Sequence, residues 1–163
     1  GQRQRFEPRN MAFTDGLDWW ELAGSFLDAG RPHWHDYFPA ADGTAVLASA
    51  VPEPSGSAVL FQEIYADDYR GAAVTFRGQL RAAGQAGLHL AAGRPVDPPG
   101  AQLRDRGGSS LTGPGSSDWI WHEVTMPVPG DAGVIRFGIS LAGRGRVELR
   151  NAELTSARPE PAE

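Results

Sequence analysis

The chain has 163 residues and no cysteine, so it is long enough for one domain with a substantial core and uses no disulfide or thiolate chemistry. All fifteen basic residues are arginine, yet the formal net charge is −5. This balance argues against direct nucleic-acid binding, which needs clustered basic side chains. No apolar run approaches the roughly 20 residues of a membrane span, so no membrane partner is predicted.

The first third of the chain predicts short strands between turns. The expected elements are a linker at 1–9 that is compatible with a preceding domain, a short strand and turn at 10–20, a strand at 21–26, an aromatic polar stretch at 33–38, and a strand at 45–51.

The remainder of the chain predicts further strands and one long loop. The expected strands are 58–65, 72–81, 86–92, an aromatic strand within 116–129, 134–141 and 146–154. Residues 93–115 show no periodicity, and a loop of this length is usually functional or disordered. Residues 156–163 are expected to form a disordered tail.

Alternation is clearest at 134–141, where Ile135, Phe137, Ile139 and Leu141 share one face of the expected strand. We expect that face to be buried. Many short strands without a helix of three turns indicate an all-β protein. We predict one antiparallel β-sandwich over residues 10–155, a jelly roll of about eight strands.

Several motifs carry a resemblance to a known fold family. They are Asn10-Met-Ala-Phe-Thr-Asp-Gly-Leu-Asp-Trp, Phe61-Gln-Glu-Ile-Tyr-Ala-Asp-Asp-Tyr-Arg-Gly, Phe137-Gly-Ile-Ser-Leu-Ala-Gly-Arg-Gly and Val147-Glu-Leu-Arg-Asn-Ala-Glu-Leu. In this order they resemble the galactose-binding-like jelly rolls of carbohydrate-binding modules. They also resemble the jelly-roll domains attached to some bacterial helix-turn-helix regulators. The resemblance covers residues 10–155 and implies the fold rather than the ligand.

The resemblance also implies a structural calcium site, because such modules often hold calcium with an acidic residue near the first strand and an aspartate in the last strand. Here the matching positions are Thr14 and Asn151, which lack a carboxylate. We therefore predict no metal site at these positions; the alternative is a site that uses Asp15 and backbone carbonyls as oxygen ligands.

Aromatic side chains form two clusters, one containing Trp34 and Tyr37 and the other Trp119 and Trp121. Rings of this kind stack on sugars, although indoles also fill sandwich cores. Trp121 and His122 lie on opposite faces of one strand, and one of those faces points away from the core. At least one of the two is therefore expected to line a groove.

The histidines suggest a polar pocket. His33 and His35 fall on one side of a strand, a spacing compatible with zinc, for which a third ligand would have to come from His122, His89 or Asp28. We favour polar lining of a pocket, or a surface strand, for His35. His89 faces opposite Leu88 and Leu90, so it should point into the open face of a sheet if these leucines are core.

Two further polar residues are candidates. Gln62 shares a strand face with Leu60 and Ile64, and a buried amide must be hydrogen-bonded. It either braces the backbone or reaches a ligand. Arg77 and Arg136 occupy an outer register that is usually solvated, and the alternative is contact with an acidic or hydroxyl-rich ligand.

These features favour non-catalytic binding of a small molecule or glycan on the open face of one sheet, with the 93–115 loop at its rim. The predicted ligand-binding residues are Gln62, Arg77, His89, Trp121, His122, Trp34, His35 and Tyr37. No catalytic residue, cofactor or metal is predicted, since the sequence has no Gly-x-Ser-x-Gly elbow, no phosphate-cradling loop and no His-Glu-x-x-His motif.

Two alternatives remain open from the sequence. An effector-sensing or interaction domain of a bacterial regulator would follow a DNA-binding domain located before Gln2. A small cyclase-type enzyme of a natural-product pathway would have a deep apolar cavity with a few polar groups. A regulator would be cytoplasmic and a carbohydrate-binding module secreted, so the sequence leaves the localisation open.

Overall fold

The computed structural model describes residues 6–23, 35–40, 43–52, 54, 56–93, 105–111 and 116–158, and these residues contain strands but no helix. The strands are β1 (Glu21–Ala23), β2 (His35–Ala40), β3 (Thr44–Ser49), β4 (Ser57–Tyr65), β5 (Ala73–Gly93), β6 (Asp105–Leu111), β7 (Ser116–Pro127) and β8 (Val134–Ala157). All of the pairings are antiparallel, and the predicted all-β class is confirmed. None of the described residues forms a helix that could cross a membrane.

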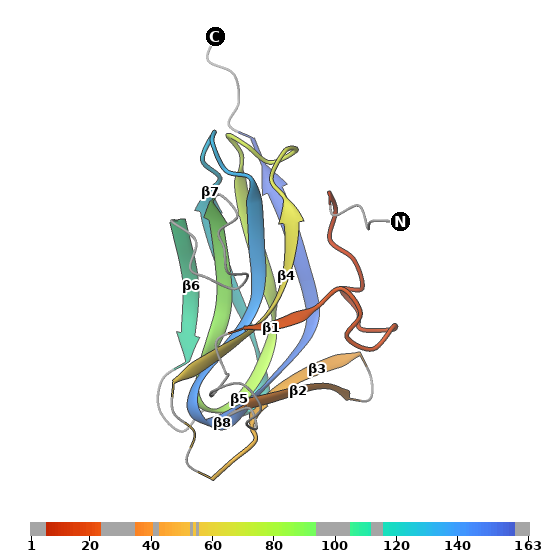
Figure 1. Ribbon diagram of the computed structural model, residues 1–163, viewed down its shortest axis with the longest axis vertical. Coiled ribbons are helices and arrows are strands. Elements are labelled where there is room, and N and C mark those ends of the chain that lie inside the picture. Colours follow the sequence, from red (N-terminus) through yellow and green to blue (C-terminus); the bar gives the residue numbers. More distant parts are fainter. Residues whose placement is uncertain are drawn as a thin grey trace, which may run out of the picture.

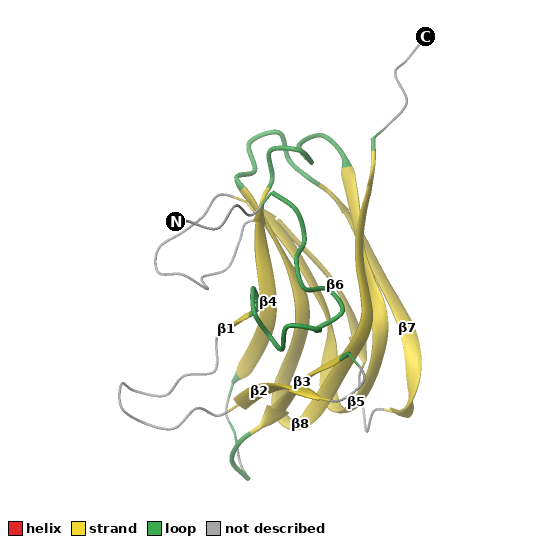
Figure 2. Ribbon diagram, turned by 90° about the vertical axis from the view of Figure 1, so that its right-hand side faces the viewer, coloured by secondary structure: helices red, strands yellow, loops and turns green. Residues whose placement is uncertain are grey.

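Two long strands, β5 and β8, contribute to both layers of the sandwich (Figure 1). The first half of β8 pairs with β4 and with the second half of β5, which gives a sheet in the order β1-β4-β8-β5-β6. We call it the β4 sheet. The second half of β8 pairs with β3 and with the first half of β5, which gives the order β2-β3-β8-β5-β7. We call it the β7 sheet. Figure 2 shows the strands from the side.

The two long strands bend together at glycines. Gly84 has φ +106°, and a Cβ atom there would lie 2.6 Å from the carbonyl oxygen of Arg144. Gly145 on β8 has φ +153°, and its Cβ would collide with the backbone of Ala83. Only glycine fits both the conformation and the close approach. The sequence predicts a break near Gly84, but the structure carries β5 through it with a shift of register.

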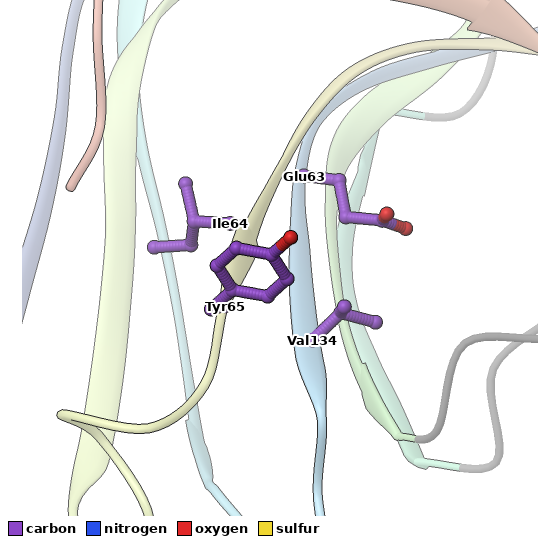
Figure 3. A pocket seen from close by; sticks show the side chains of 4 residues that line it. All are labelled: Glu63, Ile64, Tyr65 and Val134. Atoms are coloured by element: carbon purple, nitrogen blue, oxygen red, sulfur yellow. The ribbon is translucent and has the colours of Figure 1, made fainter. Parts of the chain in front are cut away.

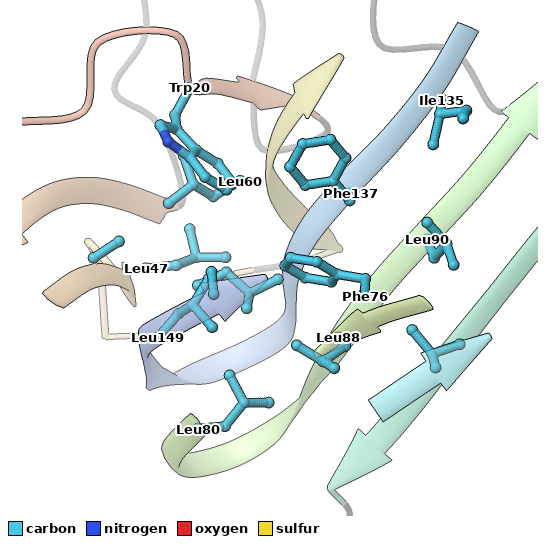
Figure 4. Packing of buried hydrophobic residues seen from close by; sticks show 14 of the residues in the cluster. Trp20, Leu47, Leu60, Phe76, Leu80, Leu88, Leu90, Ile135, Phe137 and Leu149 are labelled. Carbon is cyan, nitrogen blue, oxygen red and sulfur yellow. The ribbon is translucent and has the colours of Figure 1, made fainter. Parts of the chain in front are cut away.

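The core lies between the two sheets (Figure 4). The inward face predicted for 134–141 is confirmed, because all four of its apolar side chains are buried. Phe137 lies at the centre, with its ring 5.3 Å from that of Phe76 and 5.9 Å from that of Trp20 between centroids. Apolar contacts from both layers therefore converge on one side chain.

Three expected elements differ from the structure. Residues 11–19 form turns instead of a short strand, because the side chain of Asn10 binds the local backbone: it accepts from Asp15 N–H and donates to the carbonyls of Gly16 and Asp18. The expected 93–115 loop contains β6, which has no apolar alternation and forms by pairing with β5. The last two expected strands are the two halves of β8.

Candidate functional site

The predicted ligand-binding residues do not converge. His89 lies on the outer face of the β4 sheet, whereas Arg77 and Trp121 lie on the outer face of the β7 sheet. The expected single open face is therefore two faces on opposite sides of the sandwich. Tyr37 is exposed on β2, and Trp34 lies outside the described residues.

Gln62 braces the N-terminal segment. Its side chain is almost completely buried, with 1% exposed, and both ends of its amide are hydrogen-bonded to one residue. The Nε2 group donates to the carbonyl of Arg9 at 2.6 Å, and Oε1 accepts from the Arg9 N–H at 2.7 Å. The sequence leaves open whether Gln62 braces the backbone or reaches a ligand, and in the structure it braces the backbone.

Two histidines expected at a binding surface lie elsewhere. His35 is fully buried, and its Nε2 donates to the carbonyl of Gly143 at 2.8 Å, so it supports the bend of β8 rather than lining an open pocket. His122 is half-buried on the inward side of β7 opposite Gly78, away from the outer face that carries Trp121. Burial lowers the pKa of His122 below its ordinary value of 6.5.

The outer face of the β4 sheet carries a small hollow of about 190 Å³ (Figure 3). We call it the tyrosine hollow; its lining residues are Glu63, Ile64, Tyr65 and Val134. Glu63 and Tyr65 project from the same face of β4, and they pair with Arg136 and Val134 of β8. The ring of Tyr65 is 43% exposed, and its centroid lies 5.1 Å from that of Phe6.

A buried ion pair borders the tyrosine hollow. Arg136 Nε donates to Glu63 Oε1 at 2.6 Å, and the two side chains are 8% and 23% exposed. The guanidinium also lies over the ring of Phe61 at 5.2 Å. From the alternation of the strand, Arg136 is expected at a solvated position. The structure buries it because the carboxylate of the neighbouring strand holds it against the sheet.

Beyond the ion pair, the outer face of the β4 sheet is made of small residues. Gly138 pairs with Phe61 on one side and His89 on the other, and Gly87 and Ala91 on β5 are buried in the same face. A Cβ at position 138 would collide with the carbonyl of Leu60. Glycine at this position thus lets the strands approach closely. His89 is surrounded by small residues on this face.

The outer face of the β7 sheet has a different chemistry, with arginine and tryptophan stacked across strands. We call it the arginine–tryptophan face; its residues are Arg77, Gln79, Arg81, Trp119, Trp121, Glu148 and Arg150. The Arg77 guanidinium lies 4.3 Å from the ring centroid of Trp121, while Arg81 and Arg150 lie 4.6 Å and 4.1 Å from that of Trp119. These distances are in the range of cation–π contacts.

Glu148 anchors one end of this face. It accepts hydrogen bonds from Arg81 Nε and from Arg146 Nη2, the latter at 2.9 Å. Burial alone would raise the pKa of Glu148. The two arginines outweigh burial and lower the pKa below its ordinary value of 4.5. The carboxylate is therefore ionised at neutral pH.

The position expected to replace a calcium ligand belongs to the same face. Asn151 has φ +55° and donates to Gln79 Oε1 at 2.7 Å. Thr14 lies in the turns between 11 and 19. Within the described ranges, no group of three or more His, Asp or Glu side chains is arranged to hold a metal ion.

No protein-family model and no curated protein matches this sequence. Solved structures do match it, and the following three are covered over nearly their whole length. A CBM4 module shares 18% identity over 93% of this chain and 100% of that chain, with a TM-score of 0.65. A xylan-binding domain of CBM22 shares 13% identity, with 91% and 94% covered and a TM-score of 0.55. TmCBM61, solved with β-1,4-galactotriose, shares 14% identity, with 95% and 100% covered and a TM-score of 0.53.

The agreement in fold is thus much closer than the agreement in sequence. The predicted jelly roll is confirmed: this chain has the β-sandwich jelly-roll fold that these carbohydrate-binding modules have.

Proposed function

We propose that this domain binds a neutral glycan without catalysis, at the tyrosine hollow on the outer face of the β4 sheet. One observation carries the proposal: the exposed ring of Tyr65 lies in a hollow bordered by the Glu63–Arg136 pair. Sugar recognition needs an aromatic surface for the apolar face of the ring together with polar groups for its hydroxyls.

The polar groups suit hydroxyls in both directions. Glu63 accepts hydrogen bonds, and the guanidinium of Arg136, whose Nε binds Glu63, donates them. Because the two opposite charges lie 2.6 Å apart, they offset each other, and the site favours a neutral ligand over an ion. Because Gly138 and Ala91 are small, the outer face of the sheet is open beside the Glu63–Arg136 ion pair.

The structural neighbours support a glycan as the ligand class. One was solved with β-1,4-galactotriose, and another is a xylan-binding domain. These ligands belong to those proteins, and they serve here as the first compounds to test.

Isothermal titration calorimetry with β-1,4-galactotriose and xylo-oligosaccharides tests the proposal. We expect binding by the wild-type protein and a loss of about tenfold in affinity for Tyr65→Ala, the size expected when one ring contact is removed. Ile120→Ala is the matched control, because Ile120 has a similar exposure (41%) but lies on β7 of the other sheet. Equal affinities for the wild type and Tyr65→Ala, or no binding of neutral glycans at all, would contradict the proposal.

A further inference from the structure

The arginine–tryptophan face, on the opposite side of the sandwich, has the chemistry of a separate binding site. We propose that Trp121, with Arg77, Gln79 and Arg150, binds a uronic acid unit of an acidic glycan, a pyranose ring that carries a carboxylate. This inference does not rest on the tyrosine hollow, because the two surfaces belong to different sheets and share no side chain.

The two tryptophans of this face have different roles. Trp119 is contacted by two guanidinium groups, those of Arg81 and Arg150, and its side chain is half-buried. Trp121 is 47% exposed and is the most exposed large apolar side chain of the described residues. Trp119 therefore belongs to the stacked framework, whereas Trp121 offers ring surface on which a pyranose can stack.

Hydrogen-bond donors are in excess around Trp121. Gln79 Oε1 accepts from Arg150 Nε at 2.8 Å and from Asn151 Nδ2 at 2.7 Å, which directs its oxygen into the network. Within the described part of the chain, the Gln79 NH₂ group and the terminal nitrogens of Arg150 have no hydrogen-bond partner. Arg77 is also without a hydrogen bond among these residues, its nearest carboxylate oxygen being that of Glu153 at 3.7 Å. A ligand rich in acceptors would satisfy these donors.

The charges of the arginine–tryptophan face favour a ligand with a single carboxylate on each sugar ring. The outward positions of β5, β7 and the second half of β8 carry four arginines (77, 81, 146 and 150) and three glutamates (123, 148 and 153), a net charge of +1 in a chain of net charge −5. Glu148 already binds Arg81 and Arg146. Arg77 and Arg150 remain for a ligand, and a guanidinium binds a carboxylate in a forked geometry.

The glutamates that lie between the arginines of this face also argue against a nucleic acid as its ligand. A phosphate backbone presents closely spaced charges and would meet Glu123 and Glu153, which flank Arg77 on both neighbouring strands. A uronic acid unit presents one carboxylate beside a ring, which matches one exposed indole beside a guanidinium 4.3 Å from it.

Calorimetric titration with tri-galacturonate, and with its methyl ester as the neutral counterpart, tests the site. We expect tri-galacturonate to bind, with an affinity that falls about tenfold for the ester and for Trp121→Ala. Arg77→Lys keeps the charge but loses the fork, so it should weaken binding by a smaller factor. Ile120→Ala, on the other face of β7, should bind tri-galacturonate as the wild type does.

A gain of affinity distinguishes the site from simple loss of folding. Glu153→Gln removes the carboxylate 3.7 Å from Arg77, so we expect tri-galacturonate to bind about two- to fivefold more tightly. Equal binding of acid and ester, no binding of tri-galacturonate, or no change in Glu153→Gln and Trp121→Ala would overturn the inference. Tyr65→Ala separates the two proposals, because it should weaken neutral-glycan binding at the tyrosine hollow and leave tri-galacturonate binding intact.

Discussion

The two halves of β5 show how one strand builds two unlike surfaces. Before Gly84 its outward residues are Thr75, Arg77, Gln79 and Arg81, and after Gly84 they are Gly87, His89, Ala91 and Gly93. The first set is polar, and its two arginines stack on the tryptophans of β7. Apart from His89, the second set consists of glycine and alanine, so few side chains project from the face beside the ion pair contributed by β4 and β8.

This difference shows that the chemistry of each face depends on strand pairing as much as on alternation. Arg77 and Arg136 both occupy outward positions, yet Arg77 lies over an exposed indole and Arg136 is held by Glu63. The neighbouring strand thus decides which partner each arginine has. An exposed aromatic ring remains on each face, Trp121 on one and Tyr65 on the other.

The largest expected effect comes from the core that the two faces share. Phe137→Ala removes the ring that contacts both Phe76 and Trp20, and we expect a loss of about 3 to 5 kcal/mol in the free energy of unfolding. Urea denaturation followed by fluorescence measures it. A loss below about 1 kcal/mol would mean that the inward face of β8 is assigned wrongly.

The next effect separates the two faces. Glu63→Ala removes a charge-assisted hydrogen bond from the buried Arg136, so we expect a destabilisation of about 1.5 to 3 kcal/mol and loss of neutral-glycan binding. Tri-galacturonate binding should persist in conditions where the variant is folded. If the fully folded Glu63→Ala variant bound both the neutral glycan and tri-galacturonate equally more weakly than the wild type, the two faces would not be independent.

A smaller, pH-dependent effect belongs to the arginine–tryptophan face. The pKa of Glu148 is lower in the folded chain than in the unfolded chain, so its contribution to stability is present above the unfolded value and is lost as pH falls through the folded value. Thermal melting between about pH 6 and about pH 2 should therefore show a smaller acid-induced loss for Glu148→Gln than for the wild type. If the melting temperatures of the two proteins fell in parallel with pH, the Glu148 carboxylate would not contribute to the pH dependence of stability.

The smallest expected effect is that of a chelator. Because Thr14 and Asn151 stand where carboxylates are expected, EDTA should leave the melting temperature of both the wild type and Asn151→Ala unchanged. A marked decrease on chelation, restored by calcium, would reveal a structural metal site and contradict this prediction.

Much of the fold could be predicted from local patterns. The alternation of Ile135, Phe137, Ile139 and Leu141 with smaller or polar residues correctly identifies the buried face, and the turn residues separate most strands. β6 could not be found this way, because its Gly and Ser residues carry no apolar alternation and it exists through pairing with β5.

Less of the candidate site than of the fold could be predicted from the sequence, for a physical reason. Alternation gives the side on which a residue lies but not the strand beside it, so His89 and Trp121 look equivalent although they lie on different sheets. Tyr65 was missed, although the period-two pattern places it on the same face as Glu63. The signal that was lacking is the pairing of β4 with β8, which brings Arg136 to that pair.

The most direct measurement for the proposed glycan-binding function is a ¹H–¹⁵N chemical-shift titration of the wild-type protein with β-1,4-galactotriose and with xylo-oligosaccharides. Binding at the tyrosine hollow predicts saturable shifts for the amides of Glu63, Tyr65 and Val134, with the indole N–H signal of Trp121 unchanged. Shifts confined to Trp121 and its neighbours, or no saturable shift with any neutral glycan, would contradict the assignment of glycan binding to the β4 sheet.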